Sequence, residues 1–136
     1  MQHYAQVLNQ RGYTYGRHIA PHDIQVRELG TGKSRLEIGR TLGIRFDPLP
    51  QSRLEDGINA VRMAFNRLWF DEARCERGLD CLANYRRDFN DRLGEFKSTP
   101  VHDWSSHGAD ALRYLILGTR DSKKATPIVY PKAWVA

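Results

Sequence analysis

The stretch PVHDWSSHGADALRY, residues 100–114, places carboxylates, imidazoles and hydroxyls at the start of an apolar helical pattern. Ser105 or Ser106 is a suitable N-cap, because a serine hydroxyl accepts a hydrogen bond from a free backbone amide one turn further on. The apolar residues that follow recur at helical spacing, and they are Ala109, Leu112, Leu115 and Ile116. We therefore predict a helix over residues 105–117.

This helix would gather polar side chains near its first turns. Residues three or four positions apart are neighbours on a helix, so Asp110 would lie beside His107 and Arg113. Asp103, just before the helix, could point the same way. The alternative is purely structural: Asp103 caps the helix, Asp110 pairs with Arg113 on a solvated face, and His102 and His107 have no special role.

A second candidate carboxylate follows a predicted strand. Residues 14–20 contain β-forming side chains and stop at Pro21, which leaves His22 and Asp23 at the carboxyl edge of that strand. In open α/β sheets, catalytic side chains often lie at this edge. Asp23 is therefore a candidate functional residue, whereas for His22 we favour a structural hydrogen bond to the backbone.

Several short motifs, in the same order, resemble the C-terminal nuclease domain of the large subunit of tailed-phage terminases, the DNA-packaging motors. Residues 102–114 (HDxxSHGADAxRY) resemble the family's C-terminal nuclease motif, and residues 17–23 (RHIAPHD) resemble its strand that ends in a Pro-His-Asp carboxylate. Further matches lie at residues 30–35, 55–62 and 85–87. Together the matches cover about residues 1–118, which we take as one terminase-like nuclease domain.

The resemblance implies a ribonuclease-H-like α/β fold and hydrolysis of double-stranded DNA with Mg²⁺ or Mn²⁺ held by clustered carboxylates. By position, Asp23 and Asp110 would be the catalytic metal ligands, with Asp103 and His107 as auxiliary ligands. The resemblance also implies the terminase small subunit and the portal as partners, and the cytoplasm of the bacterial host as the location.

The sequence departs from this family at its start. The family's fold opens with three antiparallel strands, the first of which carries the leading metal-binding Asp, and here the chain begins with a predicted helix. We therefore expect an N-terminally truncated, incomplete ribonuclease-H-like fold, helix-rich with a small remnant sheet. An unprotected strand edge favours pairing with another chain, so we expect a homodimer or marginal stability. The functional alternative is a catalytically inert DNA-binding or oligomerising remnant.

The charge of the chain is compatible with a nucleic-acid partner. The net charge is +5 and most basic residues are arginine, which suits bidentate contact with phosphate, although solvated surface charge explains the excess equally well. Residues 30–35 (GTGKSR) lack the spacing of an ATP-binding loop. Lys33 and Arg35 could instead hold a DNA phosphate, or Ser34 could simply cap a helix. Arg113 is the third candidate DNA contact.

Periodicity and composition predict the remaining organisation. We expect helices over residues 3–11, 34–42, 54–70 and 79–93, a brief strand over 44–46 and a mobile tail over 119–136. We expect no membrane span and no secretory signal, hence a soluble protein that stays inside the cell. Cys75 and Cys81 have neither zinc-site nor redox-pair spacing and are expected to be reduced.

Overall fold

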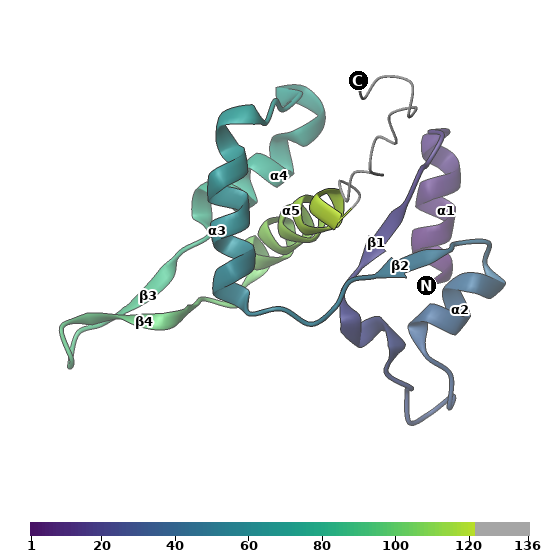
Figure 1. Cartoon of the computed structure of the whole chain (residues 1–136), viewed down its shortest axis with the longest axis horizontal. Coiled ribbons are helices and arrows are strands. Elements are labelled where there is room, and N and C mark those ends of the chain that lie inside the picture. Colours follow the sequence, from purple (N-terminus) through teal and green to yellow (C-terminus); the bar gives the residue numbers. More distant parts are fainter. Residues whose placement is uncertain (122–136) are drawn as a thin grey trace, which may run out of the picture.

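The computed structural model describes residues 1–121 and has a mixed α/β structure that surrounds one long helix, α5 (Trp104–Asp121) (Figure 1). The preceding elements are α1 (Gln2–Arg11), β1 (His18–Ala20), the 3-10 helix η1 (His22–Gln25), α2 (Arg35–Thr41), β2 (Phe46–Pro48), α3 (Leu54–Ala64), the 3-10 helix η2 (Phe65–Arg67), α4 (Glu72–Asn84), β3 (Arg87–Asn90) and β4 (Glu95–Pro100). Figure 1 shows α1, α2, β1 and β2 at one end and α3, α4, β3 and β4 at the other. Helix α5 contacts α3, α4 and β1, and so joins the two ends.

The first end contains a small parallel sheet. β1 pairs with β2, with His18 opposite Phe46. β1 is the last part of the predicted strand over residues 14–20, and β2 is shifted from the predicted residues 44–46. The shift of β2 has a clear cause, because the Ile44 amide donates to the Gly39 carbonyl at 2.9 Å and so belongs to the turn that ends α2. The mixed α/β class is thus confirmed, while the ribonuclease-H-like assignment stays a prediction.

The helices of this end begin and end as their sequence predicts. α1 stops at Gly12, whose φ of 64° is a left-handed conformation that glycine adopts without steric cost. α2 begins with a capping box: the Ser34 hydroxyl accepts from the Glu37 amide, and the Glu37 carboxylate accepts from the Ser34 amide at 2.7 Å. These hydrogen bonds also hold the pKa of Glu37 below its ordinary value.

The second end is held by close helix packing. The buried core between α3 and α5 is made of Ala60, Val61, Ala64 and Ile116, with Leu68, Leu112 and Leu117 packed against it. Glycines allow the backbone of α5 to approach its neighbours: a Cβ added to Gly108 would lie 2.5 Å from the Cys81 Cβ on α4, and one added to Gly118 would lie 2.8 Å from Ile19 on β1. α3 is shorter than the predicted 54–70, because the chain tightens into η2 after Ala64.

The predicted helix over residues 79–93 is wrong beyond Asn84. Residues 87–100 instead form an antiparallel hairpin in which Phe89 pairs with Phe96. Asn90 starts its turn, because its side-chain oxygen accepts from the Arg92 amide at 3.1 Å, and Gly94 completes the turn with a φ of 66°. The helical spacing of the apolar residues therefore misled the prediction, whereas the Asn and Gly were the correct signals.

Helix α5 extends beyond its predicted end at residue 117. Residues 119–121, predicted to begin a mobile tail, are helical, and residues 122–136 lie outside the described residues. Within residues 1–121, none of the helices combines the length and the apolar character that crossing a membrane requires.

Candidate functional site

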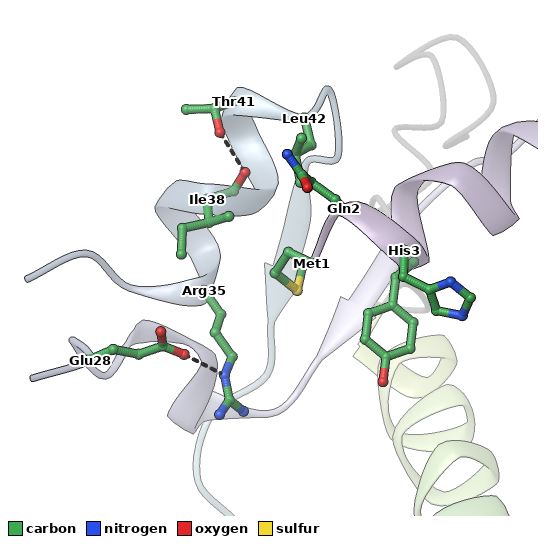
Figure 2. Close-up of a pocket in the computed structure, with 9 residues that line it drawn as sticks. Met1, Gln2, His3, Glu28, Arg35, Ile38, Thr41 and Leu42 are labelled. Atoms are coloured by element: carbon green, nitrogen blue, oxygen red, sulfur yellow. Dashed lines mark hydrogen bonds and ion pairs between the residues drawn. The ribbon is translucent and has the colours of Figure 1, made fainter. Parts of the chain in front are cut away.

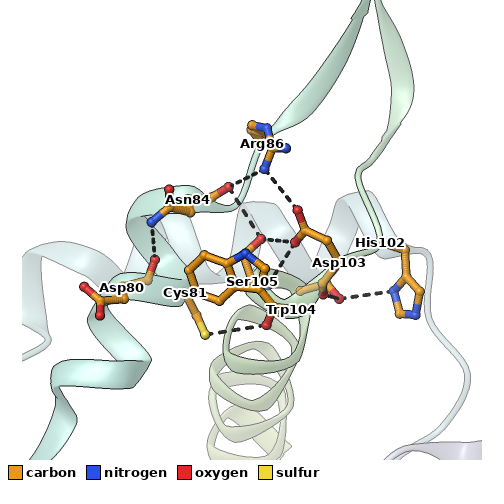
Figure 3. Close-up of polar contacts among 9 residues, drawn as sticks. Asp80, Cys81, Asn84, Arg86, His102, Asp103, Trp104 and Ser105 are labelled. Atoms are coloured by element: carbon orange, nitrogen blue, oxygen red, sulfur yellow. Dashed lines mark hydrogen bonds and ion pairs between the residues drawn. The ribbon is translucent and has the colours of Figure 1, made fainter.

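Asp103 caps helix α5 (Figure 3). Its Oδ1 accepts hydrogen bonds from the Ser105 amide at 2.9 Å and from the Ser105 hydroxyl at 2.6 Å. The Ser106 hydroxyl donates to the Asp103 carbonyl at 2.7 Å and lies 3.1 Å from the Nδ1 of His102. The structure therefore gives Asp103 the structural role that the sequence left open, and a metal-binding role stays a prediction.

The same cap also joins α5 to the end of α4. Arg86, just after α4, places its Nη1 3.1 Å from the Oδ2 of Asp103. The Cys81 thiol of α4 donates to the Trp104 carbonyl at 3.7 Å, and the Ser105 side chain between the two helices is fully buried. Asp103 is thus engaged on both carboxylate oxygens.

The cap makes the protein sensitive to acid. The hydrogen bonds from Ser105, together with Arg86, hold the pKa of Asp103 below its ordinary value of 3.8. The stability that this depressed pKa contributes is therefore complete above 3.8 and is lost as the pH falls through the lower folded-state value. We expect Asp103→Asn to be less stable than the natural protein at about pH 6, with a smaller difference at about pH 3. Urea unfolding at both values measures this, and an equal difference would contradict it.

Asp110 pairs with Arg113 one turn further along α5. The Nη2 of Arg113 donates to the Oδ1 of Asp110 at 2.8 Å, and the Arg113 side chain is only 13% exposed. The Arg113 stem packs over Gly57 on α3, where any Cβ would lie 2.6 Å from the Arg113 Cδ. The predicted ion pair between Asp110 and Arg113 is thus present.

The other candidate ligand of α5, His107, is exposed and lies near His102, with ring centroids 5.9 Å apart.

A cleft opens between α3, α5 and the base of the hairpin, and Asp110 lines it. Its volume is about 320 Å³, and its lining includes four arginines: Arg62, Arg86, Arg87 and Arg113. Tyr85 lines it too; burial raises the pKa of its hydroxyl, and the Asp110 charge adds to that rise. Of these four arginines only Arg113 was a candidate from the sequence, and no local spacing indicates that the fold brings the other three beside it.

Asp23 lies elsewhere, exposed in η1. The segments of the two candidate catalytic residues do approach one another, because Ala111 shares an open hollow of about 540 Å³ with Pro21 and Ile24. However, Asp23 does not line the cleft that Asp110 lines.

The four candidate ligands do not form one metal site in this structure. Among residues 1–121, no three His, Cys, Asp or Glu side chains are grouped so that they could hold an ion. The Asp103 and Asp110 carboxylates are engaged by Ser105, Arg86 and Arg113 instead. Binding of Mg²⁺ or Mn²⁺ therefore stays a prediction of the resemblance, and we derive no catalytic step through such ions.

The loop over residues 30–35 has internal partners. Gly32 donates its amide to the Glu28 carbonyl at 2.8 Å. Arg35 pairs with the Glu28 carboxylate at 3.1 Å (Figure 2). Ser34 caps α2, as the structural alternative predicted. Lys33 is exposed, and DNA contacts by Lys33 and Arg35 stay predictions.

The chain was also compared with known proteins. No model of a protein family matches it, and neither the curated proteins nor the solved structures contain a match.

Proposed function

We propose that this chain is a DNA-binding domain of the terminase-nuclease type, which holds the sugar–phosphate backbone and, by itself, does not cut it. The observation that carries the proposal is the gathering of four arginines in one cleft beside Asp110. This corresponds to the inert, DNA-binding alternative that the sequence raised.

The charges in the cleft favour an anion. Asp110 is the acidic residue of a lining that includes four arginines. Arg86 and Arg87 are paired with Asp103 and Glu55, at 3.1 and 2.7 Å. A guanidinium has five N–H donors, so such a pair leaves donors for a phosphate oxygen. Arg62 is bonded to a neutral group, the Asn59 side chain at 3.3 Å.

Salt dependence of duplex binding tests the proposal. If about three phosphates are contacted, affinity for a labelled DNA duplex should fall roughly 40-fold between about 50 and 200 mM salt, because each contact releases counterions. Fluorescence anisotropy measures this. The double variant Arg62→Gln/Arg87→Gln should reduce the slope of log K against log salt by about 2.

A matched control separates the cleft from general surface charge. Arg40→Gln/Arg45→Gln removes the same charge from two exposed positions outside the cleft. This control should change the slope much less. Absence of duplex binding at low salt, or equal effects of the two double variants, would refute the proposal.

The second candidate is the metal-dependent DNA endonuclease implied by the resemblance. It is favoured by the hollow that brings Ala111, next to Asp110, near Pro21 and Ile24 on either side of Asp23. Terminase small subunit, portal and host cytoplasm belong to this candidate and stay predictions of the resemblance.

Plasmid nicking distinguishes the two candidates. Under the endonuclease candidate, supercoiled plasmid with Mn²⁺ is nicked, Asp110→Asn abolishes nicking and barely changes DNA binding, and the hairpin variant Asp91→Asn retains both. Under the binding proposal, no variant nicks the plasmid. Nicking that persists in Asp110→Asn would remove Asp110 from the catalytic residues.

A further inference from the structure

The cleft beside Asp110 combines an apolar floor with a cationic rim. Its floor includes Val61 and Ala109, which are buried, and the partly buried Ile58 and Leu82. Phosphate contact alone requires no apolar floor, because the phosphates of a duplex lie on its outside. The floor is therefore an observation that backbone binding leaves unexplained.

Aromatic rings border this floor from two elements. Phe65, the first residue of η2, is 45% exposed although it lines the cleft. Tyr85 approaches from the end of α4 and is partly buried. Aromatic side chains at such positions serve as stacking platforms for unpaired bases, and stacking tolerates any base.

We propose that the cleft receives one unstacked nucleotide of single-stranded DNA, with the base against Phe65 and Tyr85 and the phosphate at Arg62, Arg86 and Arg87. This inference rests on the proposed DNA-binding function and names the form of DNA that the cleft prefers. The chemistry requires both parts of the ligand, a planar apolar group and an anion, within one concave site.

The size of the cleft agrees with one such unit. Its volume of about 320 Å³ lies at the lower end of the range of roughly 300–1,000 Å³ that is typical of small-molecule sites. In a duplex the bases are stacked and paired, so a base reaches the floor only after it leaves the stack. A single strand loses much less stacking and pairing free energy when it exposes a base. The cleft therefore selects single strands over duplexes.

Binding of a mononucleotide tests the inference directly. Isothermal titration with deoxyadenosine monophosphate (dAMP) should show binding, and inorganic phosphate should bind at least tenfold more weakly. Phe65→Ala should weaken dAMP binding about tenfold, which is about 1.4 kcal/mol, because the base loses its stacking partner. Arg62→Gln should weaken binding of dAMP by a similar factor, whereas Arg40→Gln on α2 should have no effect. Circular dichroism checks that each variant is folded.

Competition between DNA forms gives a second readout. A single-stranded oligonucleotide should bind more tightly than the duplex of the same length, and Phe65→Ala should remove most of that preference while leaving duplex binding intact. Retained duplex binding without dAMP binding, or an unchanged strand preference in Phe65→Ala, would overturn the inference and leave the proposed function standing. Binding of dAMP without binding of the duplex at low salt would support the cleft but refute the proposed function.

Discussion

Gly108→Ala is expected to lower the free energy of unfolding by about 1–3 kcal/mol. The added Cβ would lie 2.5 Å from the Cβ and 2.8 Å from the Sγ of Cys81 on α4. The Cys81 Cβ is fixed to the α4 backbone, so no rotamer change relieves the contact and the two helices must move apart. That movement outweighs the gain of about 1 kcal/mol that alanine brings to a helix. Thermal unfolding by circular dichroism measures the loss.

Gly78 provides the matched control. It lies inside α4, and a Cβ added there would meet nothing within 4 Å. Gly78→Ala should therefore raise the free energy of unfolding by about 1 kcal/mol. If both alanine variants were stabilised, α4 and α5 would not pack as closely as described.

Arg113→Ala should destabilise the protein by about 1.5–2 kcal/mol, since about 0.8 kcal/mol is lost for each of the two buried stem methylenes, Cγ and Cδ, that alanine lacks. The side chain is only 13% exposed, and its stem fills the space above Gly57. The substitution also leaves the Asp110 carboxylate without its 2.8 Å partner. Urea unfolding gives the magnitude.

Arg113→Met separates packing from charge. Methionine retains most of the stem, so this variant should lose clearly less stability than Arg113→Ala. Arg40→Ala, at an exposed position of α2, should stay within about 0.5 kcal/mol of the natural protein. Equal losses in Arg113→Ala and Arg113→Met would show that the stem does not contribute.

Local signals in the sequence predicted the start of α2 and the end of α1 well, whereas the start of α4 at Glu72, which Asp71 caps, was missed. Ser34 with Glu37, and Gly12 after α1, are hydrogen-bonding and steric signals that act within a few residues. The helix prediction failed over residues 85–93, because their apolar residues happen to fit helical spacing. The Phe89–Phe96 pair that stabilises the hairpin joins two strands, and a window along one segment cannot detect it.

The candidate site was predicted only in part. The pair between Asp110 and Arg113 follows from helical spacing, and the structure contains it. The clustering of Arg62 with Arg86 depends instead on how α3 meets the hairpin base. Such tertiary neighbours have no spacing rule in one sequence. Whether Asp23 and Asp110 lie close together also depends on tertiary packing. In the structure the two residues lie in separate surroundings.

The junction of α5 with β1 has a consequence for biosynthesis. The Arg17 guanidinium donates to the Gly118 carbonyl at 3.0 Å, which links positions 101 residues apart. A ribosome makes residue 17 long before residue 118, so the parallel strand pair emerges without the helix that covers it. Contacts between such distant positions slow folding and prolong the exposure of apolar surface. The nascent N-terminal segment therefore depends on helix α5, and translation must pass Gly118 before this part of the protein is protected.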